Sequence, residues 1–355
     1  MFHTNSVPAG IWRETSRHEQ IPTLKQFLII STTGMGDALW GTPAIRAIKK
    51  TLPRAGIDLL LQPQWEGLFY GNSNIRRLIP YYPHWYRQII RLPRLLGTRY
   101  DHVLIFHANK DIGRILPWLR CSSIWSHQQI TNLPGIPSSQ IVRFEKPVHG
   151  ILRRMAMLEK VQIPSNGTHM DIFLNDDERA EVLLFLKQNR MIPKEFIYLN
   201  IGGSMPHKQW PIDECVSLAK LILQNTSLTI VLGGGPEDVD RVDSVEKQLD
   251  RRRVTRATYR SLRANCALIA QARILVTPDS GPMHIGFALK VPTIALFAEL
   301  GHGPKYCGPI GVGKNLSTVL CGNFIDPKKE ADPDHFFSNS ILVSKVWEKV
   351  QDFLK

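Results

Sequence analysis

The stretch that decides the fold is QFLIISTTGMGDALWGTPAIRAIKKTL, which occupies residues 26–52. Residues 26–30 form a short, mostly apolar run typical of a buried strand, and the glycines that follow it indicate a tight turn. From Asp37 onward, apolar residues recur at helical spacing and predict a helix. Further apolar runs at 57–61 and 102–106 predict two more strands. Strand, helix and strand in this order are typical of a parallel sheet with crossover helices.

The second half of the chain repeats this pattern. It predicts strands at 196–201, 228–232, 274–277 and 292–297, and helices at 212–224, 266–273, 282–290 and 340–354. A proline, an asparagine and a glycine interrupt the pattern within 163–177 and indicate a linker. The sequence therefore predicts an α/β fold of two doubly wound domains that face a central cleft. We expect these domains at 1–170 and 171–338, with a terminal helix in 339–355.

The composition is that of a folded protein with reduced thiols. Of the 355 residues, 43% are hydrophobic and 21% are charged, which excludes disordered, collagen-like and disulfide-stapled chains. The five cysteines show no CxxC spacing, so we expect reduced thiols and a cytoplasmic protein. Apolar runs stay short of the roughly 18 residues that a membrane-spanning helix needs, and residues 1–20 lack the apolar core of a signal peptide.

Positive charge is concentrated in the first half. Residues 1–175 contain 21 Lys and Arg against 10 Asp and Glu, whereas the rest of the chain contains 23 against 21. The segment 76–99 has six arginines, several aromatic side chains and no acidic residue. Such a segment suits nucleic acid, a phosphorylated sugar or an anionic lipid surface, and a solvated basic face is the alternative. Because no helix-turn-helix or zinc pattern accompanies it, we expect no nucleic-acid partner. We expect Arg87, Arg91 and Arg94 to contact an anionic acceptor.

Asp37 is the first candidate for chemistry. It follows Gly36 at the start of a predicted helix, where a dinucleotide-binding GxGxxG motif fails because Leu39 occupies the third glycine position. A helix N-terminus favours an ionised carboxylate, so Asp37 is a candidate general base, and Gly36 lets a substrate approach the backbone. A helix cap is the alternative interpretation of Asp37.

A polar turn, TPDSGPMH, follows a predicted strand at residues 277–284. Asp279 or Ser280 is expected to cap the next helix, Gly281 permits close approach of a ligand, and His284 adds a hydrogen-bond donor. Because free N–H groups at a helix start attract anions, we interpret this turn as a phosphate site. A purely structural turn is the alternative.

Two further turns follow strands of the second half. Lys208 lies in the loop GGSMPHKQWP, where a mobile cation suits a phosphate, although a lone lysine is usually just solvated. Glu237 follows three glycines and suits ribose hydroxyls, or it simply faces water. Asp238 and Asp240 have the spacing of a metal-binding DxD pattern, but they lie in a polar, helical stretch and we expect no metal.

Taken together, these blocks resemble glycosyltransferase family 9, the bacterial heptosyltransferase family of lipopolysaccharide core synthesis. The blocks are FLIISTTGMGDALWGTPAIRAIKKTLP, NIGGSMPHKQWP with VLGGGPED, and ALIAQARILVTPDSGPMHIGFALKVPTIALF, and they span about residues 26–300. The resemblance implies a GT-B fold with the acceptor on 1–170, the nucleotide sugar on 171–338, and the terminal helix packed back on the first domain. It implies inverting transfer of a heptose from the substrate ADP-heptose, with Asp37 as base and without a metal or cofactor.

The resemblance also implies a donor site. The family's diphosphate-binding lysine falls on Lys208, with Ser204 in the same loop, and its ribose-contacting acid falls on Glu237. The aspartate and histidine of the family's D-x-G-x-x-H pattern fall on Asp279 and His284.

The basic first half suits a phosphorylated acceptor of the lipopolysaccharide-core type, presented at the inner face of the cytoplasmic membrane to a peripherally bound protein. The rival enzyme class is another GT-B transferase or a nucleotide-sugar epimerase that uses a different nucleotide. The non-enzyme alternative is a basic nucleic-acid-binding module, which would bind nucleic acid in a salt-sensitive manner.

Overall fold

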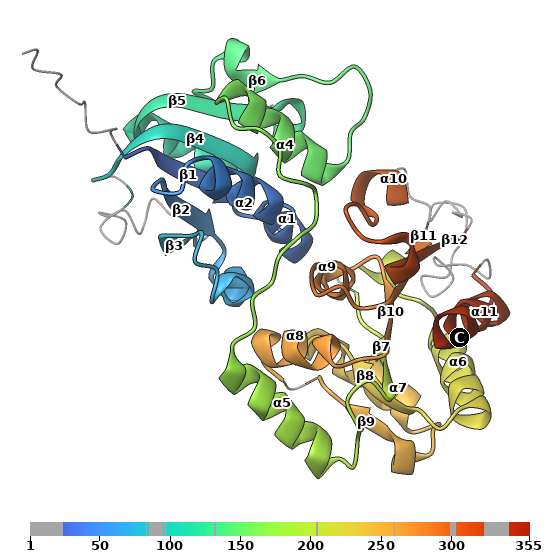
Figure 1. Cartoon of the computed structure of the whole chain (residues 1–355). Helices are drawn as coiled ribbons and strands as arrows, with labels where there is room; N and C mark the ends of the chain where they lie inside the picture. The colour runs from blue at the N-terminus through green and yellow to red at the C-terminus, as the bar shows by residue number, and fades with distance from the viewer. Residues whose placement is uncertain are drawn as a thin grey trace, which may run out of the picture.

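The computed structural model consists of two α/β halves, each built on a six-stranded sheet (Figure 1). The first sheet has the strand order β3 (Arg77–Pro80), β2 (Gly56–Leu61), β1 (Gln26–Ser31), β4 (Arg99–His107), β5 (Arg120–His127) and β6 (Ile141–Val142). The second has the order β12 (Ser317–Gly322), β11 (Thr293–Ala298), β10 (Ile274–Pro278), β7 (Phe196–Asn200), β8 (Thr229–Gly233) and β9 (Val254–Arg256). The structure describes residues 24–82, 84, 95, 97–130, 133–203, 205–258, 260–298, 303–322 and 341–355.

The two sheets have the same topology. Neighbouring strands are parallel, and each sheet, numbered from its own first strand, has the order 3-2-1-4-5-6. This doubly wound arrangement confirms the predicted α/β fold class. The strand order reverses between β1 and β4 in one sheet and between β7 and β10 in the other. Ligands of such sheets bind beyond the carboxyl ends of the strands at these two points.

Helices flank both sheets. The first half contains α1 (Met35–Leu39), α2 (Thr42–Thr51) and α4 (Gly150–Lys160). The second half contains α5 (Asp176–Gln188), α6 (Ile212–Asn225), α7 (Val239–Glu246), α8 (Leu262–Ala270), α9 (Gly281–Ala288), α10 (Pro304–Cys307) and α11 (Val343–Leu354). The single helix predicted after Asp37 is two helices, because the backbone N–H of Gly41 donates to Ala38 O (3.1 Å) in a tight turn. The Phe106 ring occupies the space that a side chain at Gly41 would need.

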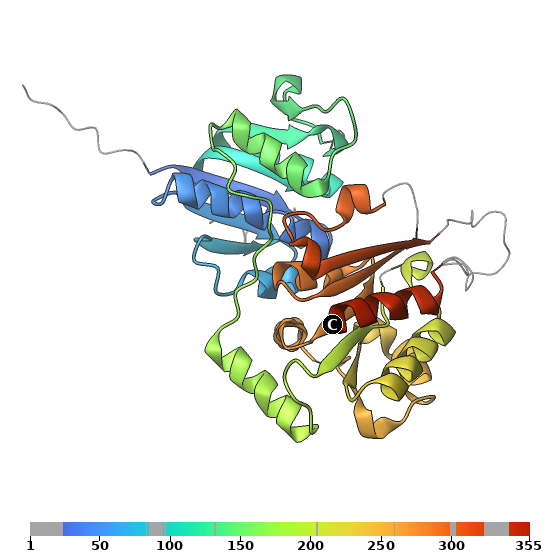
Figure 2. The ribbon, with the colours of Figure 1, turned by 45° about the vertical axis from the view of Figure 1, so that its right-hand side comes forward.

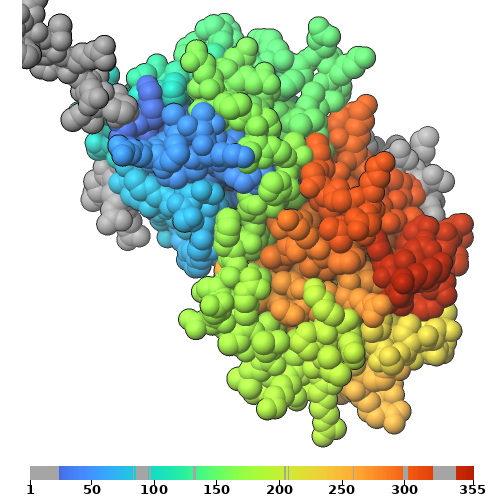
Figure 3. All heavy atoms as spheres, viewed as in Figure 1, coloured from blue at the N-terminus to red at the C-terminus, as the bar shows by residue number. Residues whose placement is uncertain are grey.

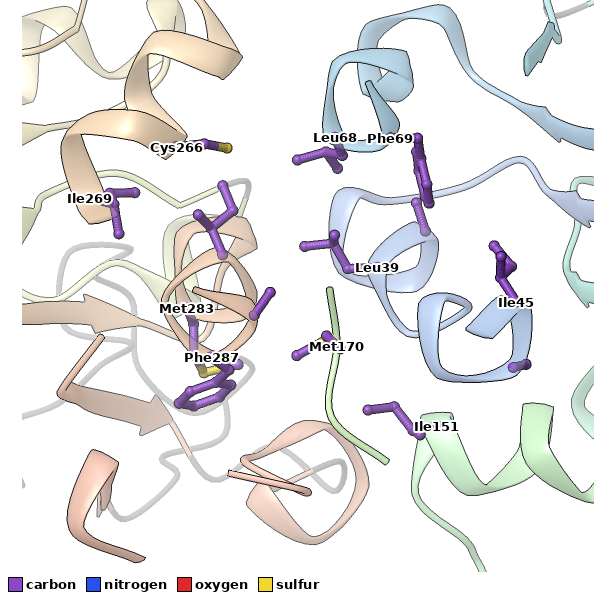
Figure 4. Packing of buried hydrophobic residues seen from close by; sticks show 14 of the residues in the cluster. Leu39, Ile45, Leu68, Phe69, Ile151, Met170, Cys266, Ile269, Met283 and Phe287 are labelled. Atoms are coloured by element: carbon purple, nitrogen blue, oxygen red, sulfur yellow. The ribbon is translucent and has the colours of Figure 1, made fainter. Parts of the chain in front are cut away.

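One buried apolar cluster runs through both halves. In Figure 4, Leu39 and Leu68 of the first half face Cys266 and Met283 of the second, and Met170 lies between them. Two further clusters belong to one half each and cover the opposite faces of the sheets. The shared cluster fixes how the carboxyl ends of the two sheets face each other.

The segment 161–175 connects the halves and includes the predicted domain boundary after residue 170. It runs from α4 to α5, and Figure 3 shows it in green across the junction between the halves. Arg263 Nη2 of α8 donates to Phe173 O (2.6 Å) and so attaches the segment to the second half. Asn175 and Glu178 form a capping box that starts α5.

The expectation that the terminal helix packs on the first half is wrong. α11 packs against α6 and β11 of the second half (Figure 2). Val346 and Val350 are fully buried in the cluster of the second half, and Arg273 Nη2 donates to Leu354 O (3.1 Å). The amphipathic pattern shows which face of this helix is buried but not which groove receives it, and α6 offers the complementary apolar face.

Two further features concern the cysteines and the character of the helices. The five cysteines, all within the described ranges, form no disulfide: Cys121, Cys215, Cys266, Cys307 and Cys321. In the part of the chain that the structure describes, no helix combines the length and apolar character needed to cross a bilayer.

Candidate active site

A cavity of about 1240 Å³ lies where the carboxyl ends of the two sheets face each other. Its first wall comes from α1, α4 and the end of β4, and its second wall from the turns after β7, β8 and β10. The helices α1 and α9 come into contact between the sheets (Figure 1). The cavity is lined by these residues of the sequence analysis: Gly36, Asp37, Lys208, Glu237, Asp279, Ser280, Gly281 and His284. The other candidates lie outside the described residues: Arg87, Arg91, Arg94 and Ser204.

Asp37 is held in place by side chains of two other segments. Thr33 Oγ1 donates to Asp37 Oδ2 (2.9 Å), and Arg154 Nη2 of α4 donates to Asp37 Oδ1 (3.2 Å). The same Arg154 nitrogen lies 3.2 Å from Asp37 O, while Nη1 donates to Gly150 O (2.8 Å). The Asp37 side chain stays 22% exposed and lines the cavity. The N-cap of α1 is Gly34, so Asp37 stands inside the first turn and not at the cap.

Opposed effects set the pKa of Asp37. Burial raises the pKa of this carboxyl, but Arg154, His107 and Thr33 together outweigh burial and lower it below its usual value. Burial lowers the pKa of Arg154 to about 10, so both partners are charged at neutral pH. Asp37 is therefore a fixed, ionised carboxylate on the first wall.

Trp40 connects the two walls. Its ring centroid lies 5.1 Å from Cζ of Arg154, and its Nε1–H donates to His284 Nδ1 of α9 (3.3 Å). Burial lowers the pKa of His284 to about 4, so the ring is neutral and its one proton is on Nε2. A Cβ at Gly36 would lie 2.7 Å from that Nε2, so only glycine lets α1 and α9 approach this closely.

On the second wall, Lys208 forms an ion pair with Asp279. Lys208 Nζ donates to Asp279 Oδ2 (2.7 Å), and the two side chains are 30% and 16% exposed. Cys307 Sγ lies 3.9 Å from the other carboxylate oxygen. The cation that we predicted to hold a phosphate thus lies beside the predicted phosphate turn, with a carboxylate as its present partner.

The turn before α9 is fixed by Asn200 at the end of β7. Asn200 Nδ2 lies 3.2 Å from the hydroxyl oxygens of Thr277 and Ser280. Ser280 stands at the N-cap, yet within the described chain no side chain caps α9, so the predicted cap is wrong. The Ser280 hydroxyl bonds within the turn, and the Asp279 carboxylate bonds Lys208. The start of α9 therefore faces the cavity without a side-chain cap.

Glu237 and Asp238 are neighbours with different surroundings. Glu237 is exposed and lines the cavity. Asp238 is buried, and its Oδ2 accepts a hydrogen bond from the N–H of Gly235 (2.8 Å) beside Gly202. Asp238 therefore joins the glycine turns after β7 and β8, while Asp240 is exposed. Nowhere in the described ranges do three His, Cys, Asp or Glu side chains gather in a group suited to a metal ion.

Several residues of the first wall were not predicted from the sequence, among them Trp40, His107, Arg153 and Arg154. His107 ends β4 and directly follows the predicted strand 102–106. Because ligands of such sheets bind beyond the carboxyl ends of strands, this position could have been predicted to line the site. Arg153 and Arg154 are adjacent arginines among apolar residues of α4, and both are buried. Arginines are rarely buried without a partner or a ligand. Two adjacent arginines among apolar residues could therefore have indicated a functional site in the sequence.

The two arginines that begin the segment 76–99 share one buried carboxylate as their partner. Arg76 Nη2 lies 2.7 Å from Asp58 Oδ2, and Arg77 pairs with the same fully buried carboxylate. Tyr81 is also buried. The sequence could not show this arrangement because Asp58 lies on the neighbouring strand β2. Further residues of the segment lie outside the described ranges: Trp85, Tyr86, Arg87, Arg91 and Arg94.

Comparison with known proteins identifies the family. The sequence model described as "Glycosyltransferase family 9 (heptosyltransferase)" matches residues 138–331, which is more than half of the chain. Lipopolysaccharide heptosyltransferase 3 of Escherichia coli (strain K12) is 24% identical over 286 residues, which are 75% of this chain and 80% of that protein. Lipooligosaccharide heptosyltransferase 2 of Haemophilus influenzae is 24% identical over 341 residues, which are 89% of this chain and 94% of that protein.

Solved structures share the fold. The glycosyl transferase family 9 structure from Veillonella parvula has a TM-score of 0.79 at 21% identity and covers 93% of this chain and 97% of its own. The E. coli ADP-heptose lps heptosyltransferase II has a TM-score of 0.75 at 18% identity and covers 93% and 98%. The two facing Rossmann-like sheets are thus the predicted GT-B fold. The chain belongs to glycosyltransferase family 9, the heptosyltransferase family of lipopolysaccharide synthesis, and is a glycosyltransferase.

Proposed function

We propose that this protein transfers a heptose from ADP-heptose to a phosphorylated acceptor of the lipopolysaccharide-core type, with inversion and without a metal. One observation carries the proposal. An ionised carboxylate, Asp37, and a cation beside an uncapped helix start, Lys208 and α9, line opposite walls of one cavity. Transfer of a sugar from a nucleotide needs a base on one side of the anomeric carbon and stabilisation of an anion on the other.

In this proposal Asp37 is the general base. A sugar hydroxyl is a weak nucleophile at neutral pH, so the Asp37 carboxylate takes its proton while the oxygen bonds to the anomeric carbon. The bond from that carbon to the phosphate oxygen breaks, and ADP leaves with the electron pair. Attack from the wall opposite the diphosphate inverts the configuration at the anomeric carbon. Arg154 holds Asp37 ionised and oriented before the acceptor arrives.

The second wall binds the donor. Negative charge develops on the leaving diphosphate, and Lys208 would exchange Asp279 for a phosphate oxygen, with Ser204 in the same loop. The dipole and backbone of the first turn of α9, from Ser280 through Gly281, add fixed positive potential, and the neutral His284 donates from Nε2. These groups supply the charge stabilisation for which other transferases use a metal. Glu237, exposed at the cavity rim, would bond the ribose hydroxyls.

We also propose that the protein works in the cytoplasm, peripherally bound at the inner face of the membrane, because its acceptor is an anionic glycolipid. The surplus of basic residues in the first half supports this location. If Arg87, Arg91 and Arg94 contact the acceptor surface, changing all three to Ser should reduce cosedimentation with anionic vesicles. Unchanged cosedimentation would show that these arginines are a solvated face.

The experiment that tests the donor is a thermal-shift panel of ADP, UDP, GDP and CMP. We expect ADP to raise the melting temperature most, and mass spectrometry to detect transfer of a heptose from ADP-heptose to heptose-free lipopolysaccharide. Stabilisation by UDP alone would favour the alternative, another GT-B transferase or an epimerase with a different nucleotide sugar. Salt-sensitive binding of nucleic acid without stabilisation by any nucleotide would contradict both.

A further inference from the structure

The segment η1 (Pro63–Phe69) of the first half reaches the second half at the start of α8. Arg263 Nη1 of α8 donates to Gly67 O (3.1 Å), and a Cβ at Gly67 would lie 3.9 Å from the Leu262 side chain. Trp65 of η1 lines the cavity together with Leu262. One end of the cavity is therefore bounded by both halves of the protein.

The Trp65 ring has a fixed orientation. Its Nε1–H donates to Thr33 O (2.9 Å), and Gln62 Nε2, directly before η1, donates to Thr32 O (2.9 Å). Both carbonyls belong to the turn after β1 that also holds Asp37, since Thr33 Oγ1 donates to that carboxylate. An aromatic ring fixed in this way can stack on a flat ligand with little further loss of conformational freedom.

The strand order of the second sheet indicates which part of the donor would reach Trp65. Along the sheet the strands follow in the order β10, β7, β8 and β9. The groups proposed to bind the diphosphate, Lys208 and α9, follow β7 and β10, and Glu237, proposed for the ribose, follows β8. The turn after β9 comes next and leads into α8, where η1 lies. A nucleotide bound in this order places its base between that turn and Trp65.

The turn after β9 contains a buried polar group that lacks a partner. Thr258 is 2% exposed and lines the cavity, and its hydroxyl has no hydrogen-bond partner among the described residues. A buried hydroxyl without a partner is unfavourable, and the ring nitrogens or amino group of a base would supply the missing bond. The charge of Arg260 in the same turn is already paired, with Glu181 of α5 (3.0 Å). This end of the cavity therefore suits a flat, uncharged ligand with polar edges.

We propose that Trp65 of the first half stacks on the nucleobase of the donor and that the Thr258 hydroxyl bonds the edge of the base; this inference rests on the proposed function. Every base has a flat π-face, so stacking on Trp65 supplies affinity, whereas the hydrogen bond at Thr258 depends on the polar groups of the base. Trp65 is thus a donor-binding residue that comes from the half expected to bind the acceptor.

The test compares ADP with ribose 5-diphosphate, which is ADP without its base, by calorimetry. We expect Trp65→Leu to weaken ADP binding at least about fivefold and to leave the affinity for ribose 5-diphosphate within about twofold of wild type. The control is Trp125→Leu, which removes a partly buried indole of the same apolar cluster outside the cavity and should bind both ligands as wild type does. Trp65→Met takes the place of Trp65→Leu if melting curves show that the latter is unfolded.

Thr258→Val tests the other side of the base without changing the size of the side chain. It should weaken ADP binding about fivefold and leave the binding of ribose 5-diphosphate unchanged. Because it removes an unpaired buried hydroxyl, it should also keep or raise the melting temperature of the ligand-free protein.

The inference is overturned if a folded variant without the Trp65 ring or the Thr258 hydroxyl binds ADP as wild type does. It is also overturned if such a variant loses as much affinity for ribose 5-diphosphate as for ADP, or if wild type binds the two ligands equally. Failure of the proposed function gives a different result: ADP binding depends on Trp65 and on the base, yet wild type transfers no heptose from ADP-heptose.

Discussion

The two walls of the cavity hold their charged side chains in different ways. On the first wall, the Arg154 side chain is 1% exposed and binds Asp37, Gly150 and the face of Trp40 at the same time. On the second wall, the Lys208 side chain is 30% exposed and its ion pair with Asp279 lies among glycine turns. A base must be oriented before the acceptor arrives, whereas a phosphate-binding cation must release one partner to take another. The difference supports the proposal that the first wall is preorganised for a base and that the second exchanges one partner of its cation for another.

We expect the largest fall in kcat from a substitution in the first wall. Asp37→Asn keeps the shape of the side chain but cannot take a proton, so we expect kcat to fall by about 10²–10⁴-fold. The measurement is transfer from ADP-heptose at saturating substrates, with Asp101→Asn, a partly exposed carboxylate of the first half outside the cavity, as the control. Normal turnover by Asp37→Asn would remove Asp37 as base.

Arg154→Gln tests whether the buried guanidinium determines the ionisation state of Asp37. Without Arg154, burial raises the pKa of Asp37 with less opposition, so less carboxylate is ionised at a given acidic pH. We therefore expect the acidic limb of the kcat/KM profile to move to higher pH. Arg154→Lys, which keeps the charge, should move the limb less.

This variant should also be less stable, because Gln leaves part of a buried hydrogen-bond network unmatched, at a cost of roughly 3 kcal/mol or more. The pH profile is therefore recorded at temperatures where melting curves show a folded protein. An unmoved acidic limb in folded Arg154→Gln would mean that Arg154 only supports the fold.

Lys208→Ala tests the exchangeable wall. A charged hydrogen bond to phosphate contributes about 1.5–3 kcal/mol, part of which Lys208 already gains from Asp279. We thus expect ADP to bind roughly tenfold more weakly, while the melting temperature without ADP changes little. Lys220→Ala, at an exposed position of α6, is the control. Equal ADP affinity in both variants would contradict the phosphate clamp.

We expect the smallest fall in kcat when the hydrogen bond between Trp40 and His284, which connects the walls, is removed. Trp40→Phe removes the Nε1–H that donates to His284 Nδ1 but keeps an aromatic ring over Arg154. One neutral hydrogen bond is worth about 1 kcal/mol, so we expect roughly a fivefold fall in kcat. A fall as large as that of Asp37→Asn would show that the walls do not act separately.

The sequence predicted those helices, strands and turns that depend on residues close to one another in the chain. The apolar runs and the glycines after β1, β7 and β8 were enough for two parallel sheets, because strand, turn and helix signals lie within a few residues of one another. The break at Gly41 was not predicted, and the contact that requires glycine there, the Phe106 ring, comes from another strand.

The site residues also divide into those that the sequence predicted and those that depend on contacts between distant segments. Asp37 and the 277–284 turn could be placed at the cavity because ligands of doubly wound sheets bind beyond the carboxyl ends of the strands. The partner of Asp37 could not, since Arg154 is 117 residues away and only the packing of α4 on the first half brings it near. The same limit explains Asp58, a buried carboxylate on another strand that pairs with two arginines of an apparent basic surface.

We propose that the base and the phosphate-binding lysine act from separate walls of the cavity, and calorimetric titration with ADP can distinguish the two. Titrated side by side, Asp37→Asn should bind ADP within about twofold of wild type, and Lys208→Ala should bind it about tenfold more weakly. If Asp37→Asn instead loses as much ADP affinity as Lys208→Ala, the carboxylate belongs to the donor site and the division of the cavity is wrong.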